Sequence, residues 1–251
     1  MVAKRIIPCL DVKDGQVVKG INFVGLKEMG DPVGMGQKYC EEGADELVYL
    51  DISASAEGRS TFTEIVKRIA RHINIPFTVG GGISCMEDAE RLLEAGADKI
   101  SLNSAAILRP ELMEEIASRY GSQFVICAID AKCMDGVWRA TMKGGRELTD
   151  KELFSWAREA QERGCGEILF TSMDHDGTKA GYAIDVYKRL GSELSIPVIA
   201  SGGAGCIDHI AEVLTEGSAD AALAASIFHY DEIGIMDLKK ELINKGIEIR
   251  L

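Results

Sequence analysis

The sequence lacks several features that would assign it to a class at once. No apolar run approaches the roughly 18 residues of a membrane-spanning helix. The 7 cysteines are an odd number and never occur as CxxC, which argues against both a disulfide framework and a zinc site. We therefore expect cysteines that are reduced and mostly buried, no metal ion and no cofactor.

Positive charge is also scarce. The chain has 28 Lys and Arg against 40 Asp and Glu, a formal net charge of −12. This balance argues against nucleic acid or an anionic membrane surface as a partner. It would also repel an anionic substrate at long range. Binding of such a substrate would then depend on backbone N–H groups and helix N-termini, which act at short range.

The N-terminal segment does not read as a targeting signal. Residues 1–12 have a basic start and a short apolar run that an Asp interrupts, without a long apolar stretch or a small-residue cleavage site. We interpret it as the first strand of a cytoplasmic protein. With 46% hydrophobic and 27% charged residues over 251 positions, we expect one domain, 1–251, of the size typical of an eight-stranded α/β barrel.

Short apolar runs alternate with amphipathic stretches along the whole chain. Strands are predicted at 4–11, 46–52, 76–81, 98–103, 123–130, 167–172, 197–203 and 220–225. Helical periodicity is clear at 63–73, 87–96, 152–164 and 208–217. Nearly all-apolar strands are typical of parallel strands covered on both faces. Eight of them indicate either an α/β barrel or a doubly wound sheet.

An internal repeat decides between these two folds. CLDVKDG (9–15) recurs as AIDAKCMDG (128–136), and NIPFTVGGGIS (74–84) recurs as SIPVIASGGAG (195–205), each displaced by about 120 residues with the order kept. Two four-stranded halves related in this way close naturally into one barrel. We predict a (βα)8 barrel, the TIM-barrel fold, with twofold pseudosymmetry.

Catalytic groups in such barrels lie at the C-terminal ends of the strands. The first predicted strand ends in Asp11 and the fifth in Asp130, so the two carboxylates should face each other across the mouth. A single Asp at a strand end is more often a helix cap or part of a turn. Two at matching repeat positions favour proton-transfer catalysis.

Small residues end the strands a quarter turn away from these aspartates. Glycine lets backbone N–H groups approach an anion, and the helix that follows favours negative charge. The first such cradle would consist of Gly81, Gly82, Asn103 and Ser104, and the second of Gly202, Gly203, Ala225 and Ser226. One Gly-Gly pair can be a simple tight turn, but matched cradles on both halves predict an elongated substrate with a phosphate at each end.

Two loops leave alternatives open. In TSMDHDGTKAGY (171–182), Thr171 has the parity of an inward side chain, and Asp176-Gly177 is either a substrate contact or an ordinary turn. The Gly-rich segment 13–32 is read as a lid, within which Lys19 either reaches the substrate or is an ordinary solvated lysine.

Four charged residues lie near the opposite ends of the strands, where the predicted strands begin: Arg5, Glu46, Lys99 and Glu167. By parity, Arg5 and Lys99 should point inward. Buried charges must be paired, because desolvation otherwise costs several kcal/mol per ion. The residues alone favour an ionic plug at the barrel floor.

The motifs CLDVKDGQVVKG, FTVGGGI, ADKISLNS, TSMDHDGTKAGY and IASGGAG together resemble the cyclase subunits of imidazole glycerol phosphate synthases, of histidine biosynthesis. The likeness runs over residues 1–251. It implies a lyase that takes ammonia from a glutaminase partner and converts the bisphosphate PRFAR into imidazole glycerol phosphate and AICAR. It also implies a heterodimer with the glutaminase docked at the N-terminal face of the barrel.

The resemblance also implies roles for individual residues. Asp11 and Asp130 would be the general acid and base. Lys19, Thr171 and Ser201 would position substrate; Gly81, Gly82, Asn103 and Ser104 would hold one phosphate; Asp176, Gly177, Gly202, Gly203, Ala225 and Ser226 would hold the other; Arg5, Glu46, Lys99 and Glu167 would gate ammonia. Ser104 stands at a position where the family usually has Thr, and it keeps the hydroxyl group. The alternatives are the ProFAR isomerase that acts one step earlier on the same barrel, and a non-catalytic activating scaffold.

Overall fold

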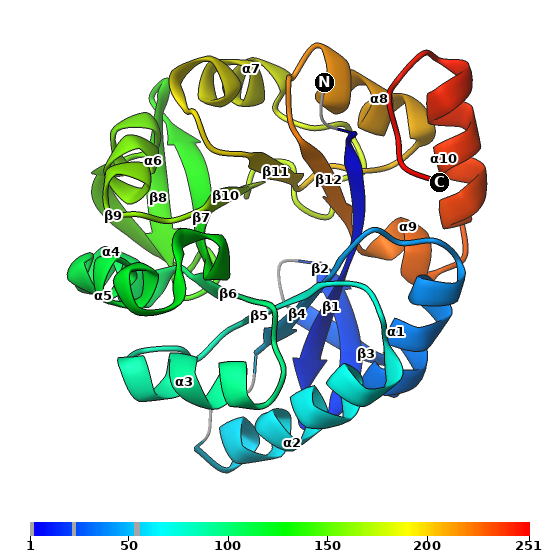
Figure 1. The fold of residues 1–251 in the computed structure, drawn as a ribbon. Coiled ribbons are helices and arrows are strands. Elements are labelled where there is room, and N and C mark those ends of the chain that lie inside the picture. The colour runs from blue at the N-terminus through cyan, green and yellow to red at the C-terminus, as the bar shows by residue number, and fades with distance from the viewer. Residues whose placement is uncertain (1–2, 22–23, 53–55) are drawn as a thin grey trace.

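The computed structural model describes residues 3–21, 24–52 and 56–251, and these form a closed barrel of parallel strands (Figure 1). The barrel strands, in order around the sheet, are β1 (Arg5–Lys13), β4 (Leu47–Asp51), β5 (Phe77–Gly80), β6 (Lys99–Leu102), β7 (Val125–Met134), β10 (Glu167–Ser172), β11 (Val198–Ser201) and β12 (Ala221–Ala224). β12 pairs in parallel with β1, which closes the barrel. The predicted (βα)8 barrel is confirmed.

Helices surround the strands on the outside (Figure 1). They are α1 (Pro32–Glu41), α2 (Ala56–His72), α3 (Met86–Glu94), α4 (Ser104–Leu108), α5 (Glu111–Tyr120), η1 (Ser122–Phe124), α6 (Leu153–Glu162), α7 (Ile184–Glu193), α8 (Ile207–Thr215), α9 (Ser226–His229) and α10 (Ile235–Asn244). None of the helices that the structure describes has both the length and the apolar character needed to cross a bilayer.

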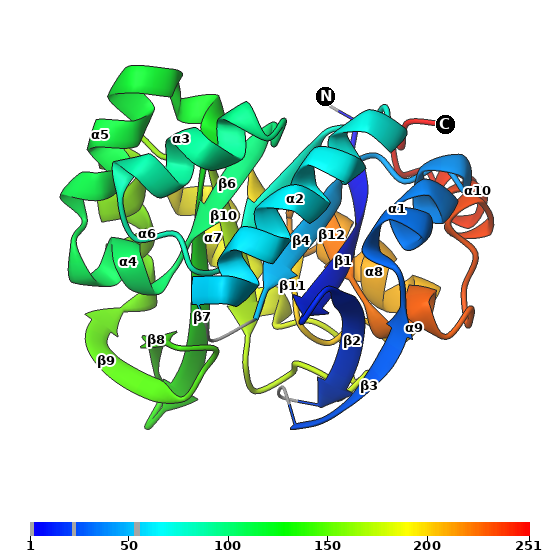
Figure 2. The ribbon, with the colours of Figure 1, turned by 90° about the horizontal axis from the view of Figure 1, so that it is seen from below.

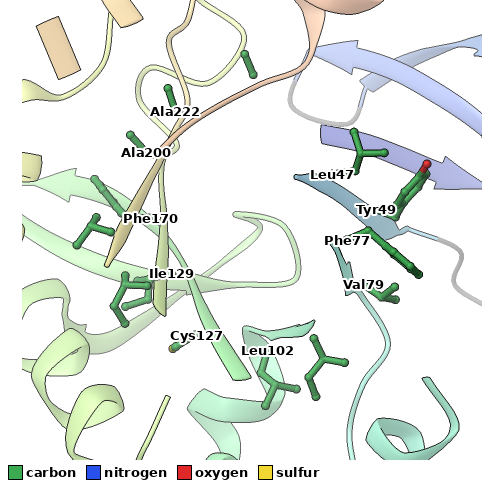
Figure 3. Packing of buried hydrophobic residues seen from close by; sticks show 14 of the residues in the cluster. Leu47, Tyr49, Phe77, Val79, Leu102, Cys127, Ile129, Phe170, Ala200 and Ala222 are labelled. Atoms are coloured by element: carbon green, nitrogen blue, oxygen red, sulfur yellow. The ribbon is translucent and has the colours of Figure 1, made fainter. Parts of the chain in front are cut away.

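Each barrel strand is buried on both faces, which explains the nearly continuous apolar runs. On β4, Leu47 and Tyr49 join the large cluster between strands and helices, whereas Val48 between them joins a smaller cluster inside the barrel. Figure 3 shows the outer cluster, with Tyr49 and Phe77 from neighbouring strands close together. Each such buried side chain contributes about 1.5–3 kcal/mol to stability.

Two antiparallel hairpins extend the barrel at one end. The segment read as a lid contains two strands that were not predicted, β2 (Gln16–Ile21) and β3 (Val24–Gly30). A second hairpin, β8 (Val137–Met142) and β9 (Glu147–Glu152), was not predicted at all. Figure 2 shows both hairpins at the end of the barrel away from the two chain termini.

The two hairpins begin with the same turn. Asp14 and Gly15 have φ of 50° and 85°, and Asp135 and Gly136 have φ of 52° and 79°. Positive φ at both central residues defines the two-residue type I′ hairpin, for which Asp-Gly is a favoured sequence. The signal was therefore present in both repeats, and only the apolar periodicity beside it was too weak to reveal the strands.

The cysteines are all free, as expected, but fewer are buried than expected. Three are buried, three are half-buried, and Cys133 is exposed. Cys133 is exposed because β7 continues past the barrel into the second hairpin, where its residues leave the core.

Candidate active site

A cleft lies at the C-terminal ends of the barrel strands and joins both halves of the chain. Asp11 and Asp130 both line it. It also contains most of the other residues predicted for this end: Lys19, Thr171, Asp176, Gly177, Ser201, Gly202, Gly203, Ala225 and Ser226.

Asp11 is paired with a cation from the first hairpin. The register of β1 and β2 sets Asp11 opposite Val18, so that Lys19 Nζ lies 4.0 Å from Asp11 Oδ2. Burial raises the pKa of Asp11 to about 6; Lys19 opposes the increase and the charge of Asp176 adds to it. A carboxyl with a pKa near neutrality can both release and accept a proton under physiological conditions.

Asp130 reaches a similar pKa with neutral partners. Asn103 Nδ2 donates to Asp130 Oδ2 at 2.9 Å, and Thr171 is the register neighbour of Asp130 on β10. Burial raises the pKa of Asp130 to about 6, and the charge of Asp176 raises it further. Hydrogen bonds from Thr171 and Asn103 act in the opposite direction.

Asp176 is negatively charged in the same cleft and disfavours ionisation of both aspartates. A carboxylate repels a phosphate, so we expect any phosphate contact in this loop to come from backbone N–H groups such as that of Gly177. The side chain of Asp176 is better suited to adjusting the proton affinity of Asp11 and Asp130.

The second cradle is built so that only glycine fits. Gly202 and Gly203 have φ of 88° and 115°. A Cβ on Gly202 would lie 2.6 Å from the carbonyl oxygen of Ser172, and one on Gly203 would lie 2.0 Å from that of Gly181. The strand end before them is fixed by Tyr187, whose hydroxyl accepts a hydrogen bond from Ser201 N at 3.0 Å.

The residues of the first cradle do not line the main cleft. Gly81 and Gly82 line a separate, small hollow, and a Cβ on Gly81 would lie 2.0 Å from the carbonyl oxygen of Asp51. Asn103, predicted to hold phosphate, donates a hydrogen bond from its amide nitrogen to Asp130. Ser104 is the first residue of α4, and its Oγ accepts a hydrogen bond from Lys143 N at 3.0 Å.

At the opposite ends of the strands, four charged side chains form a closed ring. Arg5 lies 2.7 Å from Glu46 and 2.8 Å from Glu167; Lys99 lies 3.0 Å from Glu46 and 2.6 Å from Glu167. Burial opposes the charged forms of Arg5 and Glu167, but the two carboxylates raise the pKa of Arg5, and Arg5 and Lys99 lower that of Glu167. The ring therefore pairs two cationic side chains with two carboxylates, and their formal charges cancel.

Sequence reasoning missed several residues of the cleft. Cys9, Leu50 and Leu223 line it from the inner faces of three strands, and Met173 from the loop after β10. Strand parity would have found Cys9, which is two residues before Asp11. His229 lies beneath the second cradle, at the end of α9; burial lowers its pKa to about 4, and its Nδ1 lies 2.6 Å from the hydroxyl of Tyr39.

No group of three or more His, Cys, Asp or Glu side chains suited to a metal ion occurs among the residues described. The cleft is instead a pair of carboxyl groups with pKa values near neutrality, flanked by a lysine, hydroxyls and glycine-rich strand ends. Such an arrangement can transfer protons to and from a small anionic substrate.

Comparison with known proteins places this geometry in context. Residues 5–234 match the family model described as histidine biosynthesis protein. The full chain aligns with the full length of relatives named imidazole glycerol phosphate synthase subunit HisF: 62% identity in Bacteroides thetaiotaomicron, 60% in Phocaeicola vulgatus and 56% in Flavobacterium psychrophilum.

Proposed function

The chain belongs to the histidine biosynthesis protein family, as a cyclase subunit of imidazole glycerol phosphate synthase, and from that premise we propose how its barrel carries out the reaction. The observation that supports the proposal most directly is the presence of Asp11 and Asp130 in one cleft, each with its pKa raised to about 6. We assign them as the general acid and base.

The substrate is PRFAR, a molecule with a phosphate at each end. One phosphate lies on the second cradle, against the backbone of Gly202 and Gly203 and the N-terminus of α9. The other lies near Ser104, at the N-terminus of α4. Both aspartates line the cleft beside the second cradle, so the ribulosyl carbon chain extends from there between their carboxyl groups.

The chemistry follows from this placement. Ammonia attacks the ketone at C2 of the ribulosyl part, and loss of the hydroxyl as water gives an imine, for which a carboxylic acid donates the proton. Ring closure and cleavage of the C–N bond to AICAR then need one proton removed and one returned. Two carboxyl groups on opposite sides of the substrate divide these transfers, and Lys19 keeps Asp11 available as a carboxylate.

As a subunit, the chain works in a complex with a partner. We assign the partner as a glutaminase that docks at the N-terminal face, where the ring of Arg5, Glu46, Lys99 and Glu167 lies. Ammonia released there is uncharged, so neither the cations nor the carboxylates of the ring attract it as they would attract an ion. It enters when one ion pair opens, and the apolar barrel interior, with Ile7 and Val48, keeps it from being protonated.

The test is turnover of PRFAR by the isolated chain with an ammonium salt and no partner. We expect imidazole glycerol phosphate and AICAR in equal amounts. Failure to form them at any ammonium concentration, by a folded chain, would refute the proposal and leave the activating scaffold. Turnover of the preceding aminal, ProFAR, without ammonia and at a higher kcat/KM would identify the isomerase instead.

A further inference from the structure

The turn between β8 and β9 lies directly against the first cradle. We call Lys143–Arg146 the basic turn. Lys143, Gly144 and Gly145 have φ of 53°, 65° and 81°, three left-handed residues in succession. This conformation brings Lys143 N to within 3.0 Å of Ser104 Oγ at the start of α4. The turn and the cradle are therefore one structural unit, although the sequence separates them by about 40 residues.

The hydrogen bonds of this unit leave its donors free for an anion. Ser104 Oγ accepts from Lys143, so its own proton remains to be donated. The N–H groups of Gly144 and Gly145 meet no acceptor within the described part of the chain. Successive backbone N–H groups in a left-handed turn form the kind of concavity that binds phosphate.

Positive charge is concentrated at the same place. The ammonium group of Lys143 pairs with Glu147 at 2.6 Å, with side chains 63% and 46% exposed. Such an exposed pair is only weakly stabilising, so it can be exchanged for a dianion. The guanidinium of Arg146 has no carboxylate partner in residues 3–21, 24–52 and 56–251, and Lys132 Nζ donates to the carbonyl oxygen of Gly145 at 3.1 Å.

The second cradle has no equivalent. Asp11 pairs with Val18 in the first hairpin and Asp130 with Thr141 in the second, so the position of Lys143 corresponds to Gly20. Gly20 lines the cleft with Ser226 but offers no cation. The two phosphate sites therefore differ in charge although their backbones repeat.

We propose that the basic turn is the outer wall of the first phosphate site, and that Lys143 and Arg146 provide the cations that fix one end of the substrate there. The inference rests on the proposed function and deepens it: in a chain of net charge −12, one phosphate is bound through cations and the other through backbone alone. This difference orients a substrate whose two ends are both phosphates.

The experiment is steady-state kinetics of the full chain with PRFAR and ammonium, for Lys143→Gln, Arg146→Gln and the double variant. We expect KM to rise about fivefold for each single change and more for the double, with kcat within twofold, because these contacts bind substrate without taking part in proton transfer. Glu147→Gln removes the competitor of the phosphate, so its KM should fall. Lys188→Gln, which removes an exposed lysine on α7, is the matched control and should change neither constant.

A second readout uses inorganic phosphate as a competitive inhibitor. Its Ki should rise in the double variant and its dependence on added salt should weaken, since fewer cations are involved. Unchanged KM and Ki in a double variant with normal melting temperature would overturn the inference and leave the proposed function intact. Absence of turnover by the unmodified chain would instead overturn the proposed function, whereas weaker binding of inorganic phosphate by the double variant, measured by calorimetry, would still support an anion site at the turn.

Discussion

The N-terminal and C-terminal halves of the barrel keep the same carboxylates but not the same cations. Asp11 and Glu46 of the first half recur as Asp130 and Glu167 of the second, and both hairpins begin with Asp-Gly. Gly81 packs against the backbone of Asp51 just as its repeat partner Gly202 packs against that of Ser172. The repeat therefore preserves the proton-transfer groups and the glycines that shape the cradles.

Two groups of ion pairs, the ring at the N-terminal end of the barrel and the pair of Lys19 with Asp11, take their cations from the first half alone. By the same repeat, Arg5 corresponds to Phe124 and Lys99 to Ala221. Hairpin register makes Met142 the counterpart of Lys19. Asp11 is thus held by a cation and Asp130 by the amide of Asn103. The difference teaches that two chemically identical side chains in equivalent positions can be given different neighbours, which suits them to different proton-transfer steps.

The largest expected effect tests what the halves share. Asp11→Asn and Asp130→Asn should each lower kcat by about a thousandfold, because an amide neither donates nor accepts the catalytic proton. Substrate binding, measured by calorimetry, should persist in both variants. Asp185→Asn on the exposed start of α7 is the control. Normal turnover in either active-site variant would show that the repeat of the aspartates is structural only.

The second-largest expected effect concerns the ring of charged side chains at the N-terminal ends of the strands. Glu46→Gln and Glu167→Gln each leave Arg5 and Lys99 with one carboxylate, and removing one partner of a buried ion pair costs about 3–5 kcal/mol. We expect the two losses in the free energy of unfolding to be equal, measured by urea denaturation at pH 7. A large difference between the two losses would show that Glu46 and Glu167 contribute unequally to the stability of the ring.

The aspartates should be unfavourable for stability at high pH. Because the folded chain raises the pKa of each to about 6, each favours folding at low pH, and that contribution is lost as the pH rises through 6. Asn stays neutral and avoids the loss, so either substitution should stabilise the chain at pH 8 by up to about 3 kcal/mol. Chemical denaturation should show this gain shrinking towards pH 4; a gain independent of pH would contradict it.

The smallest expected effect distinguishes Asp11 in the first half from Asp130 in the second. Lys19→Met should move the acidic limb of the pH profile of kcat/KM to higher pH, because the lysine cation lowers the pKa of Asp11. Asn103→Leu should shift the pKa of Asp130 in the same direction but less, because a neutral hydrogen bond is weaker than a charge. We expect activity to fall by roughly tenfold or less in each. Lys13→Met, on the same hairpin, is the control, and equal shifts in the two variants would remove the distinction.

Residues at strand ends were predictable because strand period and barrel topology together fix which side chains meet. Asp11 and Asp130 lie in one cleft, and Arg5 and Lys99 meet Glu46 and Glu167, for this reason. Parity defines only the side of the strand on which a residue lies.

Contacts that depend on a side-chain rotamer or on the geometry of a turn were not predictable in the same way. Strand parity could not decide whether the side chain of Asn103 contacts a phosphate or the carboxylate of Asp130. That choice depends on the rotamer of Asn103. Nor did it reveal that Lys143 reaches Ser104, because that contact depends on three successive left-handed residues in a turn whose strands are weakly apolar.

The exposure of Cys133 makes the second hairpin accessible to measurement. The other cysteines are buried or half-buried, and Cys133 is three residues beyond Asp130, next to the start of β8. A thiol-reactive fluorophore should therefore attach there first, without prior removal of other cysteines. Its emission would report directly, in solution and in real time, whether the hairpin that holds Lys143 moves when a phosphate arrives.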